Sequence, residues 1–176
     1  MNFENVDFPD SVGFRCKNCG ACCRVQPPDV DVAEKKQIEA KGFADFLDRP
    51  NGTGILWIRR KKDGGCFFFT ENNKCAIYDV RPSICRLEPF TIKDYDYEKN
   101  RIELELNFPF ACGCEGVNDA ETLPMEVIGK AAQVIVHKIL LLTAKDLCLP
   151  VTDKRVASET RARILHRGIA MANLTV

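Results

Sequence analysis

The segment Phe14-Arg-Cys16-Lys-Asn-Cys19-Gly-Ala-Cys22-Cys23-Arg24 holds four of the ten cysteines of this 176-residue chain. Two residues separate Cys16 from Cys19 and Cys19 from Cys22, so a tightly curled loop can direct these thiolates toward one centre. Gly20 permits the backbone torsions that such a curl requires. Backbone N–H groups in the loop can also point at the sulfurs and tune a cluster bound there. The segment therefore predicts a metal-binding loop, irregular up to about Pro28.

Five further cysteines complete the expected ligand set. They are Cys66, Cys75, Cys85, Cys112 and Cys114. Because the adjacent side chains of Cys22 and Cys23 tend to project apart, different roles are expected for them, and the nine thiols are expected to serve one or two metal centres. Cys148 stands between two leucines and is expected to be a core residue, since free cysteine is among the most buried residue types.

The spacing bears on which metal these thiolates bind. A structural zinc ion takes four ligands, fewer than the nine cysteines in this set. Three successive cysteines with two-residue gaps match the first three ligands of the bacterial-ferredoxin run, whose remaining ligand comes from elsewhere in the chain. Soft thiolates bind zinc and iron–sulfur clusters alike. We therefore expect an iron–sulfur cluster, of 4Fe–4S type, with zinc as the alternative.

The composition gives no indication of nucleic-acid binding or of membrane attachment. The chain has 25 basic and 25 acidic side chains, so no global field draws it to nucleic acid or to an anionic membrane. Residues Met1 to Gly13 lack the features of a signal peptide, and the most apolar stretch, Ala131 to Ala144, is shorter than a membrane span. We expect a cytoplasmic protein without a membrane element. In that reducing compartment clustered cysteines are ligands or catalysts more often than disulfides.

Periodicity and turn signals predict an α+β fold in one domain, residues 1–176. A helix is expected from Asp31 to Asp48, where Asp31 and Glu34 form a capping box. Strands are expected over Ile55 to Ile58 and Gly65 to Thr70, separated by an Asp-Gly-Gly turn. Arg101 to Phe108 alternates strictly between apolar and polar residues, which predicts a half-buried strand paired with Phe90 to Lys93.

The last third of the chain predicts helices. One is expected from Pro124 to about Leu147 and a second from about Asp153 to Ala172. The expected arrangement is a small mixed or antiparallel sheet with cysteine-rich loops and flanking helices. Residues 14–116 would form the cysteine-cluster core and residues 122–173 the helical part.

At its cysteines the chain resembles the CxxCxxCC cysteine-cluster family of zinc- or iron-chelating domains (YkgJ-like proteins). The matching motifs are Phe14-x-Cys16-x-x-Cys19-Gly-x-Cys22-Cys23-Arg24, Cys66-x-Phe68, Cys75-x-Ile77-Tyr78, Arg81-Pro82-x-x-Cys85-Arg86, Pro89-Phe90 and Cys112-x-Cys114. Relatives usually have Cys-Pro-Phe where this chain has Cys66-Phe67-Phe68. The resemblance implies metal binding. Some relatives resemble flagellin lysine methylases, which would imply modification of a protein side chain.

Several residues outside the cysteine set are candidates for a functional role. Arg15, Arg24, Arg81 and Arg86 neighbour cysteines and could stabilise thiolate charge or form ordinary salt bridges. Tyr78 is expected to be a core aromatic. His137 and His166 are expected to be structural. The basic residues of the final helix could contact nucleic acid, although a solvated helix face is the simpler interpretation.

Three functional hypotheses follow from these residues. The first is a metal-cluster protein that carries out redox chemistry or cluster-assisted modification of a protein or small molecule. The second is a non-enzymatic zinc or iron module that binds a partner or handles metal. The third, weaker, is nucleic-acid binding. Substrate, partner and oligomeric state are not indicated by the sequence.

Overall fold

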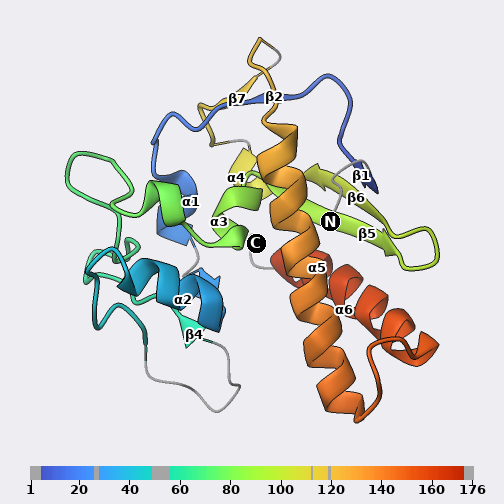
Figure 1. Ribbon diagram of the computed structural model, residues 1–176. Helices are drawn as coiled ribbons and strands as arrows, with labels where there is room; N and C mark the ends of the chain where they lie inside the picture. Colours follow the sequence, from blue (N-terminus) through green and yellow to red (C-terminus); the bar gives the residue numbers. More distant parts are fainter. Residues whose placement is uncertain (1–4, 26–27, 49–55, 112, 119, 173–176) are drawn as a thin grey trace.

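The computed structural model describes residues 5–25, 28–48, 56–111, 113–118 and 120–172 (Figure 1). Its largest sheet has the strand order β1-β6-β5, with β1 at Val6–Asp7, β5 at Phe90–Asp96 and β6 at Arg101–Leu106. β5 and β6 form an antiparallel hairpin with an irregularity between Ile92 and Asp94, and β1 runs parallel to β6. The predicted pairing of these two long segments is confirmed.

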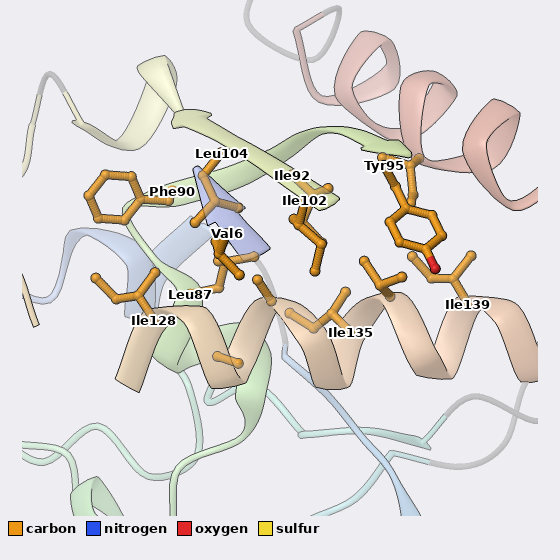
Figure 2. Packing of buried hydrophobic residues seen from close by; sticks show 14 of the residues in the cluster. Val6, Leu87, Phe90, Ile92, Tyr95, Ile102, Leu104, Ile128, Ile135 and Ile139 are labelled. Atoms are coloured by element: carbon orange, nitrogen blue, oxygen red, sulfur yellow. The ribbon is translucent and has the colours of Figure 1, made fainter. Parts of the chain in front are cut away.

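Helix α5, Met125–Leu147, lies along one face of this sheet, and α6, Lys154–Ala172, packs against both α5 and β5. Both helices were predicted, so the expected α+β class with a helical C-terminal third is confirmed. Figure 2 shows Val6, Ile92, Ile102 and Leu104 of the sheet pointing toward Ile128, Ile135 and Ile139 of α5. This apolar contact is the larger of the two hydrophobic cores.

Helix α5 is also long and apolar enough to cross a bilayer by length and composition alone. In the structure it is a continuous helix of 23 residues, longer than the stretch considered in the sequence. Of its most apolar 18-residue window, 56% is buried within the fold. A buried core helix of a water-soluble protein has the same character.

A second core lies between the cysteine-bearing loops. Its shell includes two short antiparallel strands, β3 at Asp29–Val30 and β4 at Leu56–Trp57, and helix α2 at Val32–Glu39. The buried side chains of this core are Val30, Ile38, Phe46, Ile58, Cys66, Phe68, Phe69 and Ile77. Phe68 is the centre of an aromatic group, with Phe43, Phe46 and Phe67 at ring-centroid distances of 5.1 to 5.3 Å.

Short elements connect the two cores. They are β2 at Gly13–Phe14, α1 at Ala21–Val25, the 3-10 helix η2 at Tyr78–Val80, α3 at Ser83–Leu87, α4 at Phe108–Ala111 and β7 at Val117–Asn118. β2 and β7 pair antiparallel, which joins the beginning of the cysteine segment to the chain after Cys114. In Figure 1, α1 and α2 lie on one side of the molecule and the large sheet with α5 and α6 on the other, while α3 lies between them and packs against α5.

Several predicted boundaries were wrong. Helix α2 has the predicted capping box but ends at Glu39 instead of Asp48, because Gly42 takes a left-handed conformation with φ of 87°. Gly65 to Thr70 is not a strand: only isolated bridges, Arg60 with Cys66 and Phe69 with Cys75, form there. Ile55 of the other predicted strand lies outside the described residues.

The end of β6 also differs from the alternating pattern. Phe108 was expected on the buried face of the strand but is 67% exposed and begins α4. Asn107, expected on the solvent face, is buried. The strand stops at Leu106 because Pro109 has no N–H for a ladder and suits the first turn of a helix.

A polar network joins α2, α3 and α5. Ser83 donates its backbone N–H and its hydroxyl to Oε1 of Glu34 at 2.8 and 2.7 Å. Lys138 Nζ donates to Oε2 of the same carboxylate at 2.8 Å and lies 3.2 Å from Asp31. Burial by itself raises the pKa of Glu34, but Lys138 and the hydrogen bonds from Asp31 and Ser83 outweigh it, so the net pKa is lowered. Glu34 is therefore a largely buried anion that positions the helix carrying Cys85.

We predict that Glu34→Ala destabilises the protein by about 3 kcal/mol, because Lys138 and Ser83 lose a buried acceptor together. The matched control is Glu39→Ala in the same helix, whose exposed carboxylate pairs with Lys35 and whose loss should change stability by less than about 0.5 kcal/mol. Urea unfolding of the two variants checks this. Equal loss of stability in both would contradict the role given to Glu34.

Candidate metal centre

A cavity of about 400 Å³ lies between the two cores, and cysteines line much of it. Within the described part of the chain, the lining cysteines are Cys16, Cys19, Cys22, Cys23, Cys66, Cys75, Cys85 and Cys114. Thus eight of the nine predicted ligands face one cavity, and the ninth, Cys112, lies outside the described residues. The described cysteines are free thiols.

The cavity lies at the interface of the two cores, and each core contributes cysteines to it. Cys16 and Cys114 pack against the sheet and α5, whereas Cys23, Cys66 and Cys75 belong to or pack against the second core. Thiols from the two sides are close enough to influence one another: the charge of Cys16 acts on Cys75. A metal bound here would therefore take ligands from both halves of the fold.

The first cysteine segment is held at both ends. Arg15 donates its backbone N–H to the carbonyl of Gly116 at 2.9 Å, which extends the β2–β7 pairing and brings Cys19 within hydrogen-bonding distance of Cys114. After Gly20 the chain enters α1, which carries Cys22 and Cys23. The segment was predicted to be irregular throughout, and this helical turn is a correction: it directs both adjacent thiols to the same cavity.

Gly20 is the turning point of the loop. Its φ is 77°, in the left-handed region that favours glycine. A Cβ atom added there would lie 2.3 Å from Cζ of Phe69 and 2.4 Å from Nη1 of Arg24. The guanidinium of Arg24 lies over the Phe69 ring, 4.6 Å from its centroid. The loop thus packs tightly against the second core at the point where it turns.

The other thiols reach the cavity from separate segments. Cys66 donates its backbone N–H to the carbonyl of Cys23 at 2.8 Å, which fixes the two cysteines relative to each other. Cys75 follows in the bridge with Phe69. Cys85 is carried by α3, the short helix whose first residue, Ser83, is bound by Glu34.

The comparisons with known proteins can be set beside this geometry. The model of the CxxCxxCC family, described as "Putative zinc- or iron-chelating domain", matches residues 15–107. The chain belongs to this family. The match ends before Cys112 and Cys114, so it covers seven of the nine predicted ligands.

One curated relative is "Uncharacterized protein MJ0661" of Methanocaldococcus jannaschii, 28% identical over 121 residues. The aligned part covers 62% of this chain and 61% of that protein. No solved structure matches the chain. Family membership therefore supports zinc or iron chelation by the cysteines, and the particular metal follows from neither comparison.

The thiols of this CxxCxxCC protein differ in acidity. The hydrogen bond from Cys23 is the main reason that the pKa of Cys22 is lowered to about 7, and the charge of Arg81 also lowers it. Donating that hydrogen bond raises the pKa of Cys23, and burial adds to the effect. Burial is the main cause of the raised pKa values of Cys66, Cys75, Cys85 and Cys114. Since metals bind thiolates, metal binding here must release protons from buried thiols.

The donor set fits a soft metal, but the thiols are not gathered around a single point. Among residues 5–25, 28–48, 56–111, 113–118 and 120–172, no group of three or more Cys, His, Asp or Glu side chains is arranged to hold one metal ion. Zinc needs four ligands at about 2.0 to 2.3 Å. Thiols spread around a cavity fit a polynuclear centre better, because its ligands bind different metal atoms.

A carboxyl group that the sequence reasoning missed also faces this cavity. Glu88 follows α3, and its Oε2 is buried without a hydrogen-bond partner among the described residues. Burial, together with the charge of Cys22, raises its pKa to about 8. The sequence signal for it is weak: an acidic residue between Leu87 and Pro89, three positions after Cys85.

Other predicted roles need correction. Cys148 is not a core residue: it is exposed, in a left-handed conformation at the end of α5, because the helix terminates there. Tyr78 is also not buried; it is 45% exposed on η2, with the Arg81 guanidinium 4.0 Å from its ring centroid. Arg86 donates to the carbonyls of Arg81 and Asp79. His137 and His166 need no correction, since they are exposed on α5 and α6 and neither lines the cysteine cavity.

We predict that Gly20→Ala lowers the metal content of the purified protein by at least about half, because the buried Phe69 ring blocks the space for a Cβ atom. Gly42→Ala is the matched control: its φ is also positive, at 87°, but a Cβ atom there would meet nothing within 4 Å. The control should lose about 1–2 kcal/mol of stability and keep its metal. The metal content of both purified variants is measured. Equal metal content would contradict the proposed clash between a Cβ atom at position 20 and the Phe69 ring.

Proposed function

We propose that this protein holds a 4Fe–4S cluster in the cysteine cavity. The supporting observation is that eight described cysteines, from separate segments of the chain, line one cavity of about 400 Å³. Cys16, Cys19, Cys22 and Cys23 would be the primary ligands. Cys66, Cys75, Cys85 and Cys114 would complete the site or a second one, with Cys112 as a further candidate from the sequence. A bound 4Fe–4S cluster would supply one-electron chemistry.

The surroundings suit such a centre. Phe14, Phe69, Ile135 and Ile139 contribute apolar walls that shield part of the cavity from water, while Cys22 remains exposed. Arg81 also lines the cavity and already favours the thiolate form of Cys22. Limited water access and a nearby cation both influence the potential of a thiolate-bound cluster. We infer redox chemistry, or cluster-assisted modification of a protein or small molecule, in the cytoplasm.

A structural role is the second candidate, and one observation favours it. The cavity lies where the two cores meet, and its thiols come from both. A zinc or iron centre closed on all sides by cysteines would link the two cores without carrying out a reaction. Such a module would have no exchangeable coordination position.

The nucleic-acid hypothesis finds little support in the final helix. Arg155 pairs with Asp153, Arg161 with Asp94, and Arg163 with both Asp146 and Glu159. These carboxylates neutralise much of the basic charge that motivated the hypothesis.

The direct test is iron, zinc and acid-labile sulfide analysis with a visible spectrum, on protein purified without oxygen. About four iron and four sulfide per cluster, with a brown colour that bleaches on reduction, would support the proposal. Colourless protein with one or two zinc ions would overturn it and favour the structural module.

We further predict that Cys19→Ala lowers the iron and sulfide content, whereas Cys148→Ala leaves both unchanged. Cys19 lines the cavity and contacts Cys114, while Cys148 is exposed at the end of α5 and does not line the cavity. Both changes remove one thiol, one from the cavity lining and one from the exposed end of α5. Equal metal and sulfide content in the two variants would refute the ligand assignment.

A further inference from the structure

Asp29 and Glu88 both line the cysteine cavity, and among the described residues the carboxyl of Glu88 is the one with a buried oxygen that has no hydrogen-bond partner. It lies directly after α3, the helix that presents Cys85, and it lines the same cavity as the thiols. Its backbone N–H is bound to the carbonyl of Ile84, so the start of its side chain is fixed relative to Cys85. Its Oε2 atom is buried and accepts no hydrogen bond within the part of the chain that the structure describes.

An ionised carboxylate is costly to bury unless it is paired or bound to a metal, and with a pKa of about 8 the Glu88 carboxyl is mostly protonated at neutral pH when no cation is near. Two basic groups line the cavity beside the thiols: Lys17 pairs with Glu121, and Arg81 lies over Tyr78 and lowers the pKa of Cys22, but neither pairs with Oε2 of Glu88. The neighbouring charge that acts on Glu88 is that of Cys22, which repels it. A cation inside the cavity would compensate both groups.

We propose that Glu88 is a ligand of the metal centre, so that its donor set consists of cysteine thiolates and one carboxylate. This inference rests on the proposed cluster. A carboxylate is a harder donor than a thiolate, and iron in a sulfur-rich centre holds it less firmly. The metal atom bound by Glu88 would be the exchangeable one, where a substrate with an oxygen or nitrogen donor could replace the carboxylate. Such a position is what an enzyme needs and a closed structural site lacks.

The test compares wild-type protein with Glu88→Gln, Glu88→Cys and the control Glu105→Gln, an exposed carboxylate on β6. Iron release to a chelator is followed by absorbance, and X-ray absorption reports the oxygen and sulfur atoms bound to iron. We expect Glu88→Gln to release iron about ten- to a hundredfold faster than wild type, as loss of a supporting group does at other metal sites. Glu88→Cys should restore slow release, with sulfur in place of the oxygen neighbour, and Glu105→Gln should match wild type.

The outcomes separate the two proposals. Wild-type protein without iron and sulfide would overturn the cluster and this ligand together. A wild-type cluster with release rates unchanged in Glu88→Gln would overturn the ligand alone. An iron environment without an oxygen neighbour in wild type would do the same, because Glu88 would then only donate a hydrogen bond to a thiolate. If Glu88→Gln fails to fold, the X-ray absorption spectrum of Glu88→Cys decides instead: replacement of the oxygen neighbour by sulfur supports the ligand, and an unchanged iron environment overturns it.

Discussion

Glu34 binds three helices through one carboxylate, and the position of the cysteine cavity depends on it. One oxygen accepts both the backbone N–H and the hydroxyl of Ser83, and the other accepts from Lys138 on α5. Helix α3 has only five residues, too few to be stable alone, so its place is set by these bonds and by its packing on α5. Helix α3 carries Cys85 and leads to Glu88. The contact between Glu34 and Ser83 therefore helps to determine where these two cavity-lining side chains lie.

The cavity exists because two cores meet without merging. The sheet and α5 bury their own apolar faces, and the phenylalanine cluster around Phe68 buries a second set. Between them lie thiols with raised pKa values, a buried carboxyl and apolar walls. Neutral thiols can pack in such an interface as small apolar groups. A metal centre bound in this cavity would connect the two cores through metal–thiolate bonds. Metal binding would then contribute directly to the stability of the whole fold.

Local signals explain what the sequence could predict. The capping box of α2, the β5–β6 hairpin and the two final helices each depend on residues close in the chain, and each was found. The cysteine motif of residues 16–23 was recognised for the same reason, since its spacing is local, and the family match supports metal binding there. The wrong predictions lie where a local feature interrupts the regular pattern: Phe108 leaves the strand for α4 beside Pro109, Cys148 caps the end of α5, and Tyr78 stacks with the nearby Arg81 at the surface. Glu88 was missed because a carboxyl is ordinarily a surface group, and only the fold shows it buried among thiols.

Structural and reactive roles for such a centre are usually treated as alternatives, but here they can be assigned to different ligands. Thiolates contributed by both cores would provide firm bonds across the interface, and they suffice to explain stabilisation. They do not explain a carboxyl held in the same cavity, because an apolar residue in its place would be less costly to bury. A fold that only needed a link between its cores would gain nothing from Glu88. A buried carboxyl oxygen without a partner among the described residues, placed among soft thiols, is therefore the feature that favours a reactive metal centre over a purely structural one.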